Sequence, residues 1–303
     1  MRDTLARLLA LFTSLGSACA NFDRHVDASA PPDVPALPTP PAEALANVVH
    51  VGAGRWHTCA VESSGAVRCW GLNNSGQVGT ATSAACASMP CVLHATTVEG
   101  VTGAARVGGG SVSTCARDGG GRVYCWGDNT HGQLGLTDTP SRVTPSSVPG
   151  LPALADLAVG GAHACGRAMD GPSVHCWGYG EIGQFGDGMR PVMGRPATRI
   201  DMLAGAAQLF AGDAHGCVAD ASGRVRCWGS TAAGQVGVEP GEDCTATALG
   251  RWPTRCVTMP LAVQGLASGV AELALGFNHT CARLGDGSVW CWGSNEDGQL
   301  GSV

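Results

Sequence analysis

The sequence has little charge, few tyrosines and phenylalanines, and no excess of basic residues. Of its 303 residues 14% are charged, and the formal net charge is −6. Such a chain lacks the basic patch that attracts a phosphate backbone, so nucleic acid is not an expected partner. Two tyrosines and five phenylalanines are outnumbered by eight tryptophans, whereas glycine is abundant at 46 residues. Glycine-rich chains with short apolar segments are typical of all-β proteins.

A long apolar run is also missing from the N-terminal region, where residues 1–20 resemble a secretory or lipoprotein signal. Arg2 and Arg7 supply positive charge, and a short apolar stretch and small residues follow. The stretch is too short to cross a bilayer as a helix. Two processing routes stay open: ordinary signal-peptidase cleavage, or lipidation of Cys19, which lies in a segment similar to a bacterial lipobox. Both predict an exported protein, either freely extracellular or lipid-anchored in the cell envelope.

Residues 21–46 are rich in Ala, Asp and Pro and show no apolar periodicity. This composition predicts a flexible, partly extended linker. Part of the segment could instead add an edge strand to the last unit of the domain that follows. The predicted organisation is therefore a signal at 1–20, a linker at 21–46 and a repeat domain at 47–303.

One phrase recurs five times in the repeat domain: a cysteine, about ten residues, Cys-Trp-Gly, and then Gly-Gln-x-Gly. The first cysteines of successive copies lie 56, 50, 52 and 64 residues apart. A phrase repeated at this spacing predicts a propeller or solenoid. It also favours architecture over catalysis, because a catalytic site is normally singular. The copies run from Cys59 to Gly79, Cys115 to Gly135, Cys165 to Gly186, Cys217 to Gly237 and Cys281 to Gly301.

Fourteen cysteines remain when Cys19 is set aside, and an even number in an exported chain predicts seven disulfides. The two cysteines of each copy flank a turn, so they lie opposite each other in a β-hairpin at a Cα separation that a disulfide spans. The third copy holds one extra residue, which predicts a bulge or a wider turn. The expected hairpin pairs are Cys59 with Cys69, Cys115 with Cys125, Cys165 with Cys176, Cys217 with Cys227, and Cys281 with Cys291.

The other four cysteines, Cys86, Cys91, Cys244 and Cys256, lie in two insertions that each follow a Gly-Gln-Val-Gly. The simplest pairing joins Cys86 to Cys91 and Cys244 to Cys256, and a cross-link between neighbouring units stays open. Because the insertions follow equivalent positions of the repeat, we expect both to emerge on the same face of the domain.

These repeats resemble those of the regulator of chromosome condensation family. Residues 53–61 match the first part of the family phrase, and residues 293–301 match its Gly-x-Asn-x-x-Gly-Gln-Leu-Gly part. The resemblance covers the chain from Asn47 onward and implies a β-propeller with four-stranded antiparallel blades. The paired cysteines look like a variant common in secreted bacterial members. Family propellers usually have seven blades, so five motifs imply a small or open propeller, or a truncated product.

The copies depart from one another at two positions. The second has Ser113 where the others carry His57, His163, His215 and His279. The fourth has no asparagine after its Trp-Gly and reads Ser230-Thr231-Ala232-Ala233.

No metal site, cofactor or catalytic set is expected. A His-x-Cys…Cys set offers ligand types that zinc accepts, but each copy supplies only three and one lacks the histidine. We therefore expect the histidines to be structural, with hydrogen bonds to the backbone between strands. The Cys-Trp-Gly tryptophans are expected to pack between strands. Trp56, Trp252 and Trp290 lie outside the repeated position.

The residue types that dominate protein interfaces gather in the Cys244–Cys256 insertion, which contains Arg251, Trp252 and Arg255. These three are the candidate partner-binding residues. The predicted function is a non-enzymatic exported propeller that binds a protein or an envelope polysaccharide through loops on one face.

Within the resembled family some members promote guanine-nucleotide exchange, some sense ultraviolet light and some secreted ones inhibit β-lactamases. Export argues against the first role, and the regular tryptophan spacing argues against the second. The alternative is a hydrolase or lyase with acidic residues at the central channel, for which Asp156, Asp213 and Asp220 are available.

Overall fold

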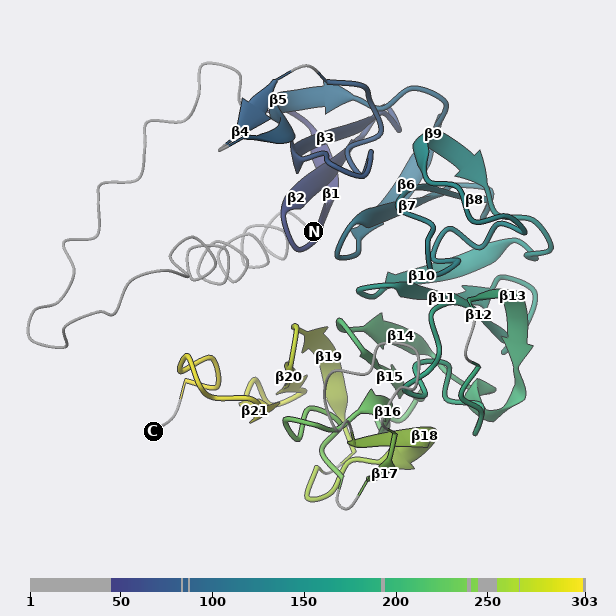
Figure 1. Cartoon of the computed structure of the whole chain (residues 1–303). Coiled ribbons are helices and arrows are strands. Elements are labelled where there is room, and N and C mark those ends of the chain that lie inside the picture. Colours follow the sequence, from purple (N-terminus) through teal and green to yellow (C-terminus); the bar gives the residue numbers. More distant parts are fainter. Residues whose placement is uncertain are drawn as a thin grey trace, which may run out of the picture. The chain divides into compact units, whose positions relative to one another are not determined.

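The computed structural model describes residues 45–82, 84–86, 88–191, 194–238, 241–244, 255–266 and 268–301. The chain from Leu45 onward forms one compact unit, an all-β propeller of five blades that follow one another around a common axis (Figure 1). This confirms the predicted fold class. The predicted signal, Cys19 and residues 21–44 of the predicted linker lie outside the described residues.

Each blade is an antiparallel sheet whose strands follow chain order from the axis outward. Blade 1 contains β1 (Val48–Ala53), β2 (His57–Glu62), β3 (Val67–Leu72) and β5 (Met89–Thr97), with the short β4 (Ala85–Cys86) added at its edge. Blade 2 contains β6 (Ala104–Gly109), β7 (Ser113–Asp118), β8 (Val123–Gly127) and β9 (Arg142–Ser147). Blade 3 contains β10 (Leu154–Val159), β11 (His163–Ala168), β12 (Val174–Gly178) and β13 (Arg195–Ile200), followed by the 3-10 turn η2 (Asp201–Leu203).

Blade 4 contains β14 (Gln208–Ala211), β15 (His215–Ala219), β16 (Val225–Ser230) and β18 (Arg255–Ala262), with the short β17 (Glu242–Asp243) at its edge. Blade 5 contains β19 (Val270–Leu275), β20 (His279–Leu284) and β21 (Val289–Gly293). Four strands per blade were predicted. Within the described residues the fifth blade has three, because no fourth strand pairs with β21.

The hairpin of the second and third strands is cross-linked in every blade. The two cysteines of each hairpin are direct register partners, and their Cα atoms lie 4.1 Å apart. In blade 3 the register of Cys165 with Cys176 is kept, so the extra residue widens the turn and makes no bulge. Cys86 bonds to Cys91 and Cys244 bonds to Cys256, each within its own insertion. The fourteen described cysteines thus form seven disulfides.

The apolar core lies between consecutive blades. Val61 and Val67 of blade 1 pack with Val107 and Trp126 of blade 2, and equivalent clusters join the later blades. Because a single sheet cannot bury its own faces, each blade depends on its neighbours for the burial that stabilises it.

A recurring set of contacts, which we call the blade joint, holds one blade to the next. At the first joint the main-chain oxygen of Gln77 accepts hydrogen bonds from Trp126 Nε1 at 3.0 Å and Thr114 Oγ1 at 2.7 Å. Thr114 Oγ1 also lies 2.8 Å from His57 Nε2. Since the one hydroxyl proton goes to Gln77, the imidazole N–H is the donor to Thr114.

The joint between blades 4 and 5 repeats this arrangement. The main-chain oxygen of Gln235 accepts from Trp292 Nε1 at 3.0 Å and from Thr280 Oγ1 at 2.9 Å, and His215 Nε2 lies 2.9 Å from Thr280 Oγ1. The histidines were expected to bond to the backbone between strands. That expectation is wrong for His57 and His215, because each bonds to a threonine hydroxyl of the next blade.

The two middle joints keep the packed indole but lack the histidine–threonine hydrogen bond, and Trp177 Nε1 has no partner among the described residues. Ser113 replaces the histidine of blade 2, and Ala164 replaces the threonine that would have faced it. His163 of blade 3 meets Gly216 where a threonine stands elsewhere, and neither of its ring nitrogens has a partner among the described residues. Trp228 still donates to the main-chain oxygen of Gln184 at 2.7 Å. These two joints depend on packing more than on polar contacts.

In blades 1 to 4 the last glycine of the Gly-Gln-x-Gly lies against the indole of the next blade. A Cβ on Gly79 would lie 2.9 Å from Trp126, one on Gly135 would lie 2.8 Å from Trp177, and one on Gly237 would lie 2.9 Å from Trp292. All three glycines also have positive φ. The position excludes a side chain both because of its conformation and because of the indole.

We predict that Gly135→Ala destabilises the protein much more than Gly301→Ala. Both glycines have φ of +69°, but a Cβ on Gly135 would meet Val148 and Trp177, whereas a Cβ on Gly301 has nothing within 4 Å. We expect a loss of about 1 kcal/mol for Gly301→Ala from the left-handed backbone alone. Overpacking should add about 1–3 kcal/mol for Gly135→Ala. Denaturant unfolding measures both; equal losses would contradict the packing role.

We also predict that acid weakens the fold before carboxylates titrate. Burial lowers the pKa of His57 and of His163 to about 4, and that of His215 to about 3. In the unfolded chain a histidine titrates near 6.5. The unfolded state therefore binds more protons between these values, and stability falls as the pH drops from about 6.5 toward 4. These three histidines together should lower the free energy of unfolding by about 3 kcal/mol per pH unit between about pH 6 and 5.

The control for this pH dependence is His163→Ser, which places in blade 3 the residue that blade 2 carries. It should reduce the slope of unfolding free energy against pH by about 1 kcal/mol per pH unit, the share of one buried histidine, while His50, whose pKa burial also lowers to about 4, keeps its own share. An unchanged slope would show that His163 is not buried and neutral in the folded protein.

Candidate partner-binding face

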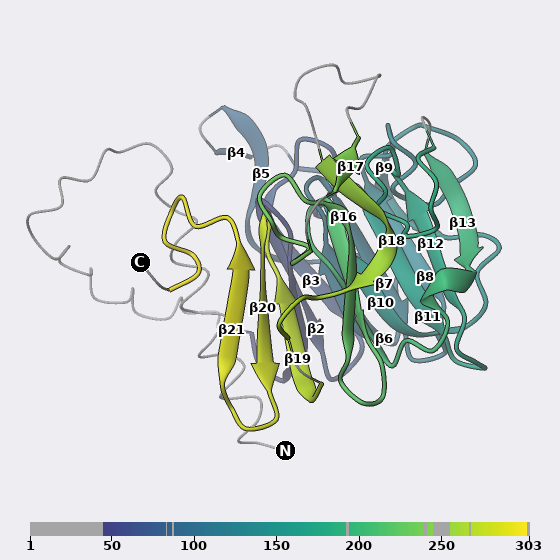
Figure 2. The same cartoon turned by 90° about the horizontal axis from the view of Figure 1, so that it is seen from below.

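Because neighbouring strands within each blade are antiparallel, two sets of loops lie at the same end of every blade. These are the loops between the first and second strands, next to the axis, and the Gly-Gln loops that follow the third strands. Figure 2 shows this end, from which the segments carrying β4 and β17 also project. We call it the loop face. The described parts of the two disulfide-bonded insertions, which carry β4 and β17, share it, as the repeat register predicted. The hairpin turns between second and third strands lie at the opposite end.

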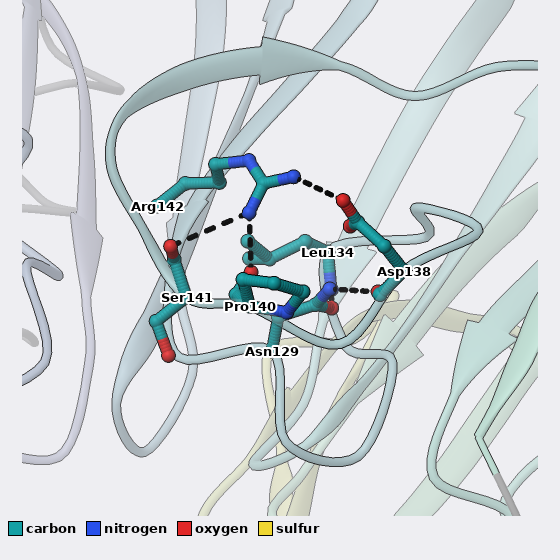
Figure 3. Close-up of polar contacts among 6 residues, drawn as sticks. All are labelled: Asn129, Leu134, Asp138, Pro140, Ser141 and Arg142. Carbon is teal, nitrogen blue, oxygen red and sulfur yellow. Dashed lines mark hydrogen bonds and ion pairs between the residues drawn. The ribbon is translucent and has the colours of Figure 1, made fainter.

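The Gly-Gln loops are fixed by their own polar side chains. In blade 2 the Asn129 side chain accepts from Leu134 N at 3.1 Å and donates to the main-chain oxygen of Asp138 at 2.5 Å (Figure 3). Arg142 bonds to the Asp138 carboxylate at 2.5 Å and to the main-chain oxygen of Pro140 at 2.7 Å. Gln133 Oε1 accepts from His131 N at 2.8 Å. These side chains are already engaged, so the loops form a rigid support.

The inner loops form a continuous backbone ladder around the axis. Arg55 N donates to Gly110 O at 3.1 Å, and Ser111 N donates to Gly161 O at 2.9 Å. Gly161 N in turn donates to Asp213 O at 2.9 Å. Asp213 N lies 3.4 Å from Gly276 O in blade 5. Side chains carried by these loops are therefore held in fixed relative positions.

Five of those side chains form what we call the axial cluster: Arg55, Trp56, Ser111, Asp213 and Phe277. Ser111 Oγ donates to Asp213 Oδ1 at 2.9 Å, which joins blade 2 to blade 4. The Arg55 guanidinium lies 5.1 Å from the ring centroid of Phe277 and 5.6 Å from that of Trp56, so it bridges blade 1 and blade 5. Such cation–π contacts orient an arginine over aromatic faces.

The axial cluster is apolar at its exposed rim and polar beneath. Trp56 and Phe277 are each 50% exposed. Burial raises the pKa of Asp213, and the hydrogen bond from Ser111 and the charge of Arg55 oppose that rise. Gly161 occupies the equivalent position in blade 3, where a Cβ would lie 2.2 Å from Asp213 Oδ1. The arrangement offers two aromatic surfaces and one guanidinium to a partner.

The candidate residues in the Cys244–Cys256 insertion are only partly described. Arg251 and Trp252 lie outside the described residues, whereas Arg255 begins β18 and is exposed opposite Asp243. The ligand atoms of Glu242, Cys244 and Cys256 lie within 4.8 Å of one another. Both sulfur atoms belong to the disulfide and are not thiolate ligands for a metal.

The three carboxylates considered for an enzymatic site are dispersed. Asp213 lies in the axial cluster. Asp156 lies on β10, where its Oδ1 is 3.4 Å from Nη1 of Arg106. Asp220 lies in the hairpin turn of blade 4, at the opposite end, where it accepts hydrogen bonds from Ser222 and Arg224. A pocket of about 250 Å³ also lies at that end and contains none of the three; it is lined by Asp170, Gly171, Pro172, Ser173, Arg199, Ile200, Asp201 and Ala204.

Arg55, Ser111 and Phe277 were not predicted from the sequence as site residues. Trp56 alone attracted notice, because it lies outside the repeated tryptophan position. A signal was present: the position after the inner-strand glycine is Arg55, Ser111, Gly161, Asp213 and Phe277 in the five copies, with a different residue type each time. Varied residues within a fixed repeat indicate a position that the fold does not dictate.

Comparison with known proteins identifies the repeat. Sequence models of the regulator of chromosome condensation (RCC1) repeat match residues 48–77, 105–133, 206–235 and 270–299, and a second model of the repeat matches 120–166. The human E3 ubiquitin-protein ligase HERC2 is 30% identical over 259 residues, which are 84% of this chain and 5% of that protein. The Arabidopsis thaliana ultraviolet-B receptor UVR8 is 27% identical over 258 residues, which are 84% of this chain and 54% of the receptor. The chain thus spans about half or less of these relatives.

Solved structures show the same fold. Prp20p from Saccharomyces cerevisiae has a TM-score of 0.65 at 24% identity, over 81% of this chain and 57% of that one. Human WBSCR16 has a TM-score of 0.70 at 21% identity, over 84% of this chain and 63% of that one. None of the helices in the described part of the chain has the length and apolarity needed to cross a membrane.

Proposed function

The chain belongs to the regulator of chromosome condensation (RCC1) repeat family, and on that premise we propose that it is a non-enzymatic propeller that binds a partner protein through its loop face. The main observation in support of this function is the axial cluster. It presents two half-exposed aromatic side chains and an arginine on a ladder of backbone hydrogen bonds. Tryptophan and arginine are enriched among the residues that dominate binding energy at interfaces, and a rigid support reduces the entropy lost on binding.

The chemistry of the loop face favours a protein over other partners. Its central charges are one arginine and one partly buried aspartate, and the net charge of the chain is −6, which does not suit nucleic acid. Related propellers offer a parallel: Prp20p has binding properties toward Gsp1p and histones, and it has been seen with Kap60 bound. A polysaccharide remains the alternative ligand, and a hydrolase or lyase would need acidic groups that converge, which Asp156, Asp213 and Asp220 do not.

We predict that Trp56→Ala and Phe277→Ala each weaken partner binding by about tenfold or more. The partner is first identified with the full chain as bait, and affinity is then measured between purified components. Met169→Ala is the matched control, because Met169 is also 50% exposed but lies in a hairpin turn at the opposite end. Each variant should keep the parent unfolding temperature to within about 2 °C. Loss of affinity in Met169→Ala alone would place the contact at the opposite end and contradict the proposal.

We also propose that the protein is exported, freely or with a lipid on Cys19. The signal-like residues 1–20 support this, and so does a count of fourteen further cysteines, because disulfides persist in oxidising compartments. Intact mass of the mature protein should show loss of the N-terminal segment and a gain of fourteen alkyl groups only after reduction. A lipid mass on Cys19 would decide between the two routes. Fourteen thiols that alkylate without reduction would contradict export.

A further inference from the structure

Blade 5 carries one half of a blade joint. In the joints of blades 1 and 4, the Gln77 and Gln235 main-chain oxygens each receive an indole and a threonine from the following blade. Gln299 stands at the same position in blade 5, and no following blade supplies those donors among the described residues. A Cβ added to Gly301 would likewise have nothing within 4 Å, whereas the equivalent glycines of blades 1, 2 and 4 each lie against an indole.

The sheet face next to this half joint is exposed. Val289 is 59% exposed, whereas its equivalents Val67, Val123, Val174 and Val225 are at most 5% exposed. Cys281 and Cys291 are half-buried, whereas the other four hairpin disulfides are buried. This face has the composition of an interior and the exposure of a surface.

Blade 1 carries the other half. Val51 on its first strand is 49% exposed, although Val107, Leu209 and Leu273 are buried at the same position in blades 2, 4 and 5. Trp70 is only partly buried, whereas Trp126, Trp177 and Trp228 are buried against the preceding blade. Blade 1 therefore offers an indole donor with no preceding Gly-Gln loop among the described residues.

The third feature that has no partner among the described strands is the outer edge of β21. In the other four blades the third strand pairs with a fourth strand: β3 with β5, β8 with β9, β12 with β13, and β16 with β18. Among the described strands β21 pairs only with β20, so its outer backbone edge is free to pair. An exposed edge next to an exposed apolar face is a template for an added strand.

We propose that these three features form one docking site, the open joint, for a β-sheet unit built on the same repeat: a fourth strand followed directly by a blade with a threonine before its first cysteine and a Cys-Trp-Gly. The joints after blades 1 and 4 show the chemistry that fits, because each holds both the indole and the threonine donor. The fourth strand pairs with β21, the apolar face of the new blade covers Val289 and the Cys281–Cys291 disulfide, and its indole and threonine donate to Gln299.

Two other occupants fit less well. Residues 21–44 contain six prolines, at positions 31, 32, 35, 38, 40 and 41, and proline cannot donate to a strand ladder. A second copy of this chain would present the face of blade 1, but the residues that precede its β1 are the same proline-rich segment. It therefore brings no fourth strand for β21.

The test extends the full chain with a unit copied from its own sequence. A second copy of residues 80–135 is placed directly after Gly301; it carries β5, the three strands β6 to β8, Thr114 and Trp126. In the parent chain a mild reductant should open Cys281–Cys291 before the other hairpin disulfides, as read by alkylation and mass spectrometry. In the extended chain the reduction of Cys281–Cys291 should slow by about tenfold or more, and the unfolding temperature should rise by about 5 °C or more.

The matched control is the same extension with Trp126→Phe and Thr114→Val in the copied segment only. Thr114→Val keeps the side-chain shape, and Trp126→Phe keeps an apolar aromatic ring of smaller size; together they remove both donors to Gln299, so the protection and the rise in unfolding temperature should be clearly smaller. Three results would overturn the proposal. They are an extension that leaves both readouts unchanged, a parent chain that sediments as a dimer with Cys281–Cys291 already protected, and faster reduction of that disulfide after deletion of residues 21–44.

Discussion

The packing of one indole on the glycine-containing loop of the preceding blade is the contact on which the rest of this structure depends. A hairpin of two short strands is marginally stable alone, and even a three- or four-stranded sheet leaves two faces to cover. The disulfide in each hairpin fixes the register of its two strands, which places the tryptophan that follows the second cysteine on a defined face. The Gly-Gln loop then presents a main-chain oxygen to the indole N–H and leaves room for its ring. Each element of the repeated phrase therefore serves either the hairpin or its contact with the next one.

The joints differ in how they satisfy their polar groups, and the differences are coordinated across blades. Where the histidine of blade 2 is replaced by Ser113, the threonine expected opposite it is replaced by Ala164. A buried hydroxyl without its partner would cost more than an apolar contact, so loss of both partners together is the less costly change. Blade 3 shows the exception, because His163 is buried with neither ring nitrogen paired among the described residues. The joints after blade 1 and after blade 4 hold the complete set of histidine, threonine and indole hydrogen bonds. The loop face is built on the inner loops that these joints position.

Much of the fold could be predicted because its determinants lie close together in the sequence. The spacing of Cys59 and Cys69 around a serine-glycine turn gives the hairpin register, and five copies of that spacing give the blades. The role of His57 could not be predicted in the same way, because its partner Thr114 lies 57 residues away in another repeat. The axial cluster is harder still, since Ser111 and Asp213 are 102 residues apart and belong to blades that are not neighbours in the chain. Contacts within a repeat follow from the phrase, whereas contacts across the axis follow from how many blades separate two loops. The insertion that contains Arg251 and Trp252 was the stronger sequence signal for a partner site, yet the described residues place the rigid aromatic surface at the axis.

Each blade gains its stability from the joint it makes with the next. Amide hydrogen exchange of the full chain under native conditions measures this strand by strand. We expect the third strands of the enclosed blades, β8, β12 and β16, to exchange slowly. We expect β21 to exchange orders of magnitude faster, although its hairpin carries the same disulfide. Equal protection of β21 and β8 would contradict this dependence, because it would show that a cross-linked hairpin is stable without a following blade.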